Sequence, residues 1–106
     1  MQTKGLNNVS LYVEDLGRAA EFYQRVLGME VHLRDADQWV WLTIPGHVPV
    51  FLIRKPSVTP PPWPALCLVV DSVDGVPGVR RTGDSTGNAI YDIADPSGNL
   101  IELVTV

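Results

Sequence analysis

The sequence has a single cysteine, Cys67, and only two histidines, His32 and His47. One cysteine cannot form a disulfide within the chain, and its place in the apolar run 66–70 predicts a small buried side chain rather than a reactive thiol. Basic residues are also scarce, because no cluster is longer than Arg80-Arg81 and the net charge is −4. This charge balance argues against a nucleic-acid partner and favours a neutral or cationic small ligand.

Long apolar runs are missing as well. No stretch approaches the roughly 20 residues of a membrane-spanning helix, and residues 1–5 (MQTKG) contain no apolar segment of a secretory leader. We therefore expect a cytoplasmic protein without a membrane partner. Its 106 residues, 45% of them hydrophobic, are enough for one globular domain with a core that needs no disulfides. The sequence also has no glycine-rich nucleotide-binding loop and no recognisable nucleophile motif.

The first half begins with a strand pattern and a helix pattern. In residues 6–13 (LNNVSLYV), apolar and polar residues alternate, which predicts a half-buried strand with Asn8 and Tyr12 on its polar face. Apolar residues then recur at helical spacing from Leu16 to Leu27. Asp15 precedes them as an N-cap and Gly28 follows as a left-handed stop, so the spacing predicts a helix over 16–27.

Three further strands are predicted at 29–35, 38–44 and 48–55, with breaks at Ala36-Asp37 and Pro45-Gly46. Residues 1–55 therefore form a βαβββ module. Residues 56–64 (PSVTPPPWP) follow with five prolines in nine positions, which predicts a stiff, extended linker.

The pattern restarts in residues 65–106, where ALCLVVDSVDG repeats the register of NNVSLYVEDLG. A short polar strand, GVRRTGDS, and two apolar strands follow, and a tight turn at 95–98 joins the last two, with Asp95 as its capping side chain. Gly75, Pro77 and Gly78 disfavour a helix where the first module has one, so the second helix is expected to be abbreviated. The predicted fold class is α+β, an internal duplication of two βαβββ modules.

Three stretches, VSLYVEDLGRAAEFYQRVLGMEV, LVVDSVDG and DPSGNLIEL, resemble the vicinal oxygen chelate superfamily, the glyoxalase, bleomycin resistance protein and dioxygenase type. The resemblance spans nearly the whole chain. It implies two paired modules whose curved mixed sheets enclose a cleft, often completed by a homodimer. Members of the bleomycin-resistance type sequester a drug between two subunits without a metal ion.

In the enzymes of that superfamily four positions bind a divalent metal. On this sequence they fall on Asn8, on or next to Phe51, on or next to Ala65, and on Glu102. Only Glu102 matches, and metal centres generally need about three or four protein ligands. We therefore expect no cofactor. The alternative is a divalent ion such as Zn, Ni, Mn or Fe, bound by Glu102 with non-standard ligands such as His32 or His47.

Glu102 is a carboxylate in a predicted strand that is otherwise almost wholly apolar. Alternation in NLIELV places it on one face with Leu100 and Val104, and Ile101 and Leu103 on the other. A carboxylate in an otherwise apolar strand needs water, a cation or a hydrogen-bond partner. We expect Glu102 to point into the cleft, where it pairs with a cationic ligand group.

The aromatic residues suggest what such a cleft binds. Trp39 and Trp41 alternate in QWVWL and must share one sheet face. They belong to a predicted ligand-binding set that makes an aromatic-walled pocket with polar anchors. The set is Asn8, Tyr12, Trp39, Trp41, Phe51, Tyr91 and Glu102. Alternatively, the two tryptophans are simply core or dimer contacts.

The predicted function is metal-independent binding and sequestration of a small molecule, an antibiotic in one interpretation, by a homodimer. No catalytic residue is assigned. Two alternatives remain open at this point. One is a metal-dependent lyase, thiol transferase or dioxygenase that uses Glu102, and the other is a degenerate module that serves only as an interaction domain.

Overall fold

The computed structural model describes residues 1–84 and 86–106. The chain divides into two compact units, Met1–Val58 and Thr59–Val106, and the division falls inside the predicted linker 56–64. Each unit contains one four-stranded mixed sheet. The predicted α+β fold is confirmed.

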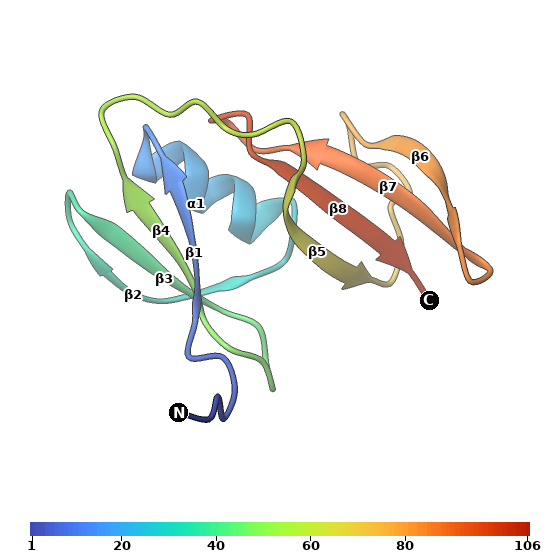
Figure 1. Cartoon of the computed structure of the whole chain (residues 1–106). Helices are drawn as coiled ribbons and strands as arrows, with labels where there is room; N and C mark the ends of the chain where they lie inside the picture. Colours follow the sequence, from blue (N-terminus) through green and yellow to red (C-terminus); the bar gives the residue numbers. More distant parts are fainter. The chain divides into compact units, whose positions relative to one another are not determined.

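The first unit is a βαβββ module. Its elements are β1 (Val9–Val13), α1 (Leu16–Arg25), β2 (Glu30–Asp35), β3 (Trp39–Thr43) and β4 (Val50–Arg54) (Figure 1). The strand order is β1-β4-β3-β2, with β1 parallel to β4 and the other neighbours antiparallel. The elements match the predicted segments, and each is shorter than predicted at one end or both.

Helix α1 covers one face of this sheet (Figure 1). Its first turn is capped by Asp15, whose Oδ1 accepts a hydrogen bond from the backbone N of Arg18 at 3.0 Å. It ends at Arg25, two residues before the predicted end, and Gly28 at φ +70° turns the chain toward β2. The side chains under the helix are at most 5% exposed: Leu11, Val13, Val40, Leu42, Val50 and Leu52.

The second unit repeats the sheet. Its strands are β5 (Pro64–Val70), β6 (Arg80–Ser85), β7 (Asn88–Ala94) and β8 (Leu100–Thr105). The order β5-β8-β7-β6, with β5 parallel to β8, matches that of the first sheet strand for strand. The predicted duplication is therefore confirmed. Strand β5 begins at Pro64, one residue inside the predicted linker, because an edge strand tolerates a proline at its first position.

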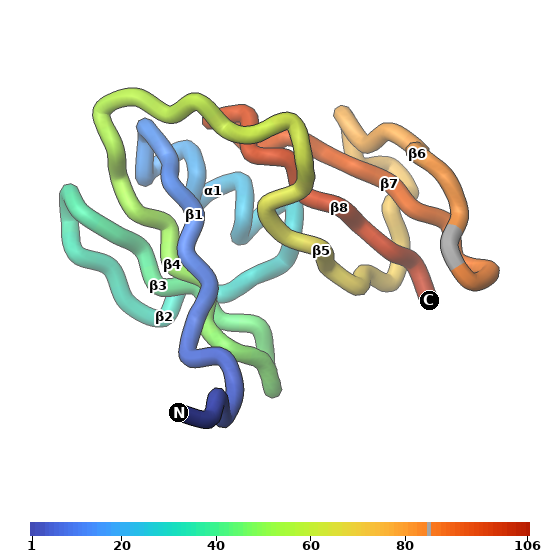
Figure 2. The backbone as a smooth tube through the Cα atoms, viewed as in Figure 1, coloured from blue at the N-terminus to red at the C-terminus, as the bar shows by residue number. Residues whose placement is uncertain are grey.

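Residues 71–79 form turns where the first unit has α1, so the abbreviated helix of the prediction is replaced by a loop (Figure 2). Gly75 and Gly78 have φ values of +74° and +83°, a conformation that is incompatible with a right-handed helix. A Cβ added at Gly78 would lie 4.0 Å from Cγ1 of Ile93. The loop therefore packs next to the core of this unit, which includes Ile93, Ile101 and Leu103.

The turn at 95–98 closes the β7–β8 hairpin as predicted. The backbone N of Gly98 donates to the carbonyl of Asp95 at 3.0 Å. The Asp95 carboxylate accepts three hydrogen bonds, from the backbone N of Ser97 at 2.8 Å, the backbone N of Asn99 at 2.9 Å and Asn99 Nδ2 at 2.9 Å. Asp95 and Asn99 are each 5% exposed, so this network fixes the turn from inside the fold.

Among the described residues, no helix combines the length and apolar character needed to cross a membrane.

Candidate functional site

The face of the first sheet opposite to α1 carries aromatic side chains from three strands. In the register, Trp41 lies opposite Phe51 on β4, and Trp39 lies opposite Ile53. Tyr12 on β1 also pairs with Ile53, so it lies on the same face as the two tryptophans. We call this surface, formed by Tyr12, Trp39, Trp41 and Phe51, the aromatic face.

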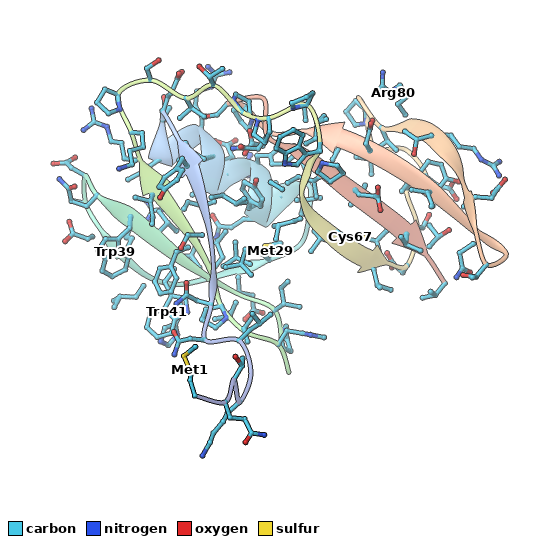
Figure 3. The ribbon with its side chains drawn as sticks, viewed as in Figure 1. Met1, Met29, Trp39, Trp41, Cys67 and Arg80 are labelled. Carbon is cyan, nitrogen blue, oxygen red and sulfur yellow. The ribbon has the colours of Figure 1, made fainter. Side chains whose placement is uncertain are left out.

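Within the aromatic face, the Phe51 ring contacts the rings of both Trp39 and Trp41 (Figure 3 labels the two tryptophans). The Phe51 ring lies 5.4 Å from the Trp41 ring and 6.0 Å from the Trp39 ring, measured between centroids. Val40 and Leu42, the alternating residues of β3, are 2% and 0% exposed beneath α1. The predicted common face of the two tryptophans is therefore confirmed, and both indoles are half-buried.

His32 joins the aromatic face through an irregularity in β2. The register between β2 and β3 shifts between Val31 and Leu33, so His32 is the extra residue of a β-bulge. Its imidazole lies 4.6 Å from the Trp41 ring at an interplanar angle of 65°. The bulge therefore directs the imidazole of His32 toward the aromatic face.

The indole of Trp41 has an unusual environment. In the part of the chain that the structure describes, Trp41 Nε1 is the buried side-chain nitrogen or oxygen that lacks a hydrogen-bond partner. Native proteins leave few such atoms, because an unpaired buried donor costs about 1–3 kcal/mol. The aromatic face therefore contains a buried N–H donor whose hydrogen bond is not made within the described residues.

Tyr12 and Asn8 lie toward the β1 side of this sheet. Tyr12 is 51% exposed, and Lys55 Nζ lies 5.0 Å from the centroid of its ring, which is a cation–π contact. Asn8 immediately precedes β1 and is exposed. Its Oδ1 accepts a hydrogen bond from Ser10 Oγ at 3.4 Å. Ser10 pairs with Phe51, so Asn8 is adjacent to the aromatic face.

In the second unit, the Glu102 carboxylate has polar neighbours on the adjacent strands. In the register Glu102 stands between Cys67 on β5 and Asp92 on β7, and Asp92 in turn pairs with Arg80 on β6. The thiol of Cys67 donates to Glu102 Oε1 at 3.4 Å. Arg80 donates to both oxygens of Asp92, from Nε at 3.2 Å and from Nη2 at 2.9 Å. Glu102 is therefore part of a polar row across the whole sheet (Figure 3 labels its two ends).

Cys67 corrects the sequence prediction, because it is exposed rather than buried. Its neighbours Leu66 and Leu68 pair with the buried Ile101 and Leu103, which leaves Cys67 on the opposite face. The pKa of the Cys67 thiol is raised, first by partial loss of water around the sulfur and then by the hydrogen bond to, and the charge of, Glu102. At neutral pH the residue is a protonated thiol.

The remaining predicted residues are not all brought together. Tyr91 pairs with Leu103, so it lies on the opposite face of the second sheet from Glu102. His47 lies in the turn between β3 and β4, where its backbone N donates to the carbonyl of Ile44 at 3.0 Å. The predicted set thus contributes four neighbouring rings and Asn8 in the first unit, and Glu102 in the second.

The residues at the family's metal positions do not fit a divalent metal. Phe51 is packed against two indoles, and Ala65 has no donor atom. Beside Glu102, the carboxylate of Asp92 is held by Arg80. Among the described residues, no three His, Cys, Asp or Glu side chains gather in a group that could hold an ion. Transition-metal centres generally require more donors than this set offers.

Comparison with known proteins places the fold. The family model of the glyoxalase/bleomycin resistance protein/dioxygenase superfamily matches residues 5–103. No curated protein has a significantly similar sequence.

Solved structures resemble the whole chain. The fosfomycin resistance protein FosX from Listeria monocytogenes has a TM-score of 0.78 at 17% identity, over 99% of this chain and 95% of that one. TnmS3, an antibiotic binding protein from Streptomyces sp. CB03234, has a TM-score of 0.74 at 21% identity, over 99% and 98%. A lactoylglutathione lyase from Agrobacterium tumefaciens has a TM-score of 0.76 at 22% identity, over 98% and 95%. At these identities the likeness shows a shared fold.

Proposed function

Because the chain belongs to the glyoxalase/bleomycin resistance protein/dioxygenase superfamily, we propose that it binds a flat organic molecule on its aromatic face without a metal ion. One observation carries the proposal. At or next to the position where the family's enzymes have a metal ligand, Phe51 contributes a ring that contacts both Trp39 and Trp41. The side chain at that position therefore recognises a ligand by stacking rather than by coordination.

The charge of the protein supports a cationic aromatic ligand. The net charge is −4, and the faces of tryptophan and tyrosine rings attract cations. The proposal assigns Asn8, Tyr12, Trp39, Trp41 and Phe51 of the first unit to the ligand-binding set. Glu102 is a separate proposed binding residue of the second unit, on a partly covered face of its own sheet.

The finer form of the proposal is sequestration of an antibiotic by a homodimer in the cytoplasm. Two of the similar structures, an antibiotic binding protein and a fosfomycin resistance protein, bear names of this kind. In the superfamily a second copy often completes the cleft. Light scattering coupled to size-exclusion chromatography tests the dimer, and a monomer at all concentrations would contradict that part.

Tryptophan fluorescence tests the binding itself. In the presence of a chelator, the protein is titrated with a panel of cationic aromatic antibiotics, and at least one is expected to quench the emission saturably. Trp39→Leu should lower the affinity for that ligand about tenfold, because a stacked ring contributes on the order of 1–3 kcal/mol to binding. Trp63→Leu is the matched control, since Trp63 is 64% exposed and precedes β5. A flat response across the panel would contradict the proposal.

A metal-dependent lyase, thiol transferase or dioxygenase is the second candidate function. It is favoured by Glu102, which occupies the one family ligand position that this sequence matches. Metal analysis of protein purified without chelator separates the two candidates. Stoichiometric Zn, Ni, Mn or Fe that disappears in Glu102→Ala would establish the metal-dependent candidate and remove the first.

A further inference from the structure

We propose that Trp41 Nε1 is a specificity-determining hydrogen-bond donor, so that the ligand is a planar aromatic compound with an acceptor atom at its edge. Suitable acceptors are a ring nitrogen, a carbonyl oxygen or an ether oxygen. This inference rests on the proposed function, because it names the chemical class of ligand that the aromatic face selects.

The environment of the indole carries the argument. Trp41 Nε1 is buried and has no hydrogen-bond partner. Two rings contact the indole, those of Phe51 and His32. Phe51 has no acceptor, and the imidazole meets the indole at 65° without forming a hydrogen bond with it. The N–H therefore remains available to an acceptor that the folded chain does not itself supply.

The two rings differ in their freedom to move. Phe51 is on β4, which has strands on both sides, and its ring contacts those of both Trp39 and Trp41. His32 is exposed, lies on the edge strand β2 and is the extra residue of the bulge. Of the two rings that contact the Trp41 indole, the His32 imidazole is thus the one that can move away from it. Its displacement lets the edge of a ligand reach Nε1 while the ligand ring stacks on the remaining aromatic side chains.

A pair of isosteric probes tests the donor. Naphthalene and quinoline have the same fused rings and differ in one ring nitrogen, which is an uncharged acceptor at pH 8. The wild-type protein should bind quinoline about tenfold more tightly than naphthalene, the ratio that one additional neutral hydrogen bond supports. In Trp41→Phe the ratio should fall to about one. In the matched variant Trp39→Phe both affinities should fall together and the ratio should persist.

Nuclear magnetic resonance of the wild-type protein provides a readout that does not depend on the folding of a variant. The indole N–H signal of Trp41 should move downfield with quinoline and should not do so with naphthalene. In His32→Ala the same N–H should exchange with solvent deuterium at least about tenfold faster in the free protein, because the imidazole that covers the indole is removed.

The outcomes separate this inference from the function on which it rests. If both probes bind with equal affinity and neither moves the N–H signal downfield, the donor role is wrong and the binding function stands. If neither probe nor any antibiotic of the panel binds, both are wrong. An unchanged exchange rate of the Trp41 indole N–H in His32→Ala would show that the imidazole does not cover this donor.

Discussion

Cys67 and Glu102 stand side by side on the parallel strands β5 and β8, with the thiol sulfur 3.4 Å from Oε1 of the carboxylate. The carboxylate that seemed out of place in an apolar strand thus accepts a hydrogen bond from its neighbour. It also adds to the effect of partial burial in raising the pKa of the Cys67 thiol, because a hydrogen-bonded negative charge beside a thiol opposes formation of the thiolate.

Removal of the carboxylate should therefore activate the thiol. In Glu102→Ala, the pKa of Cys67 loses two of the three causes that raise it, the hydrogen bond and the charge. The pH midpoint of alkylation by iodoacetamide, followed by mass spectrometry, should move to lower pH than in the wild type. Cys67→Ser should not be modified at all, since the chain has one cysteine. An unchanged midpoint in Glu102→Ala would contradict the pairing.

The turn that closes β7 and β8 depends on one carboxylate. Asp95→Ala would deprive three donors of their acceptor, two backbone N–H groups and the Asn99 amide. We expect a loss of about 3 kcal/mol in the free energy of unfolding, measured by urea denaturation, because the loss of an acceptor costs about 1–3 kcal/mol for a buried donor, and the two Asn99 donors are buried. The exposed Asp74→Ala serves as the control and should change stability by less than about 0.5 kcal/mol. Equal effects of the two substitutions would show that the network is not structural.

The turn between β6 and β7 offers a stabilising substitution. Thr86 has φ +50°, a left-handed conformation that is unfavourable for a β-branched residue, and Gly87 follows with φ +83°. Asparagine-glycine is the preferred sequence for a two-residue turn of this geometry. Thr86→Asn should raise the free energy of unfolding by about 1 kcal/mol, measured by urea denaturation. A decrease would mean that the turn adopts another conformation in solution.

The two faces of the first sheet should respond differently to truncation. Leu52 is fully buried under α1, whereas Leu33, which pairs with Trp41, is 53% exposed. Leu52→Ala should cost about 3 kcal/mol, because it leaves a cavity in the core, and Leu33→Ala should cost less than about 1 kcal/mol. Urea denaturation monitored by tryptophan fluorescence measures both. Similar costs would indicate that the aromatic face is itself part of a core.

Much of this architecture could be predicted from local patterns. Alternation placed Trp39 and Trp41 on one face of β3 and Glu102 on the partly covered face of β8. This works because successive side chains of a strand point to opposite faces, so the face of one residue fixes the faces of all the others. Asp95 was recognisable from the composition of its turn. These features depend on neighbours within a few residues along the chain.

Other features depend on contacts that the sequence pattern does not encode. Cys67 lies in a continuous apolar run, which does not reveal which residues alternate outward, so its exposure was missed. The bulge that turns His32 toward Trp41 has no residue signature in β2. Tyr91 was grouped with Glu102 before the pairing of β7 with β8 placed the two residues on opposite faces.

The central claim is that the aromatic face binds an organic molecule without the aid of a metal ion. Its most direct test is a titration of the chelator-treated protein with proflavine, a flat aromatic cation, followed through the three tryptophan indole N–H signals by nuclear magnetic resonance. Our account predicts that the signals of Trp39 and Trp41 shift and saturate while that of Trp63 stays in place. Signals that move only after a divalent metal ion is added would contradict it.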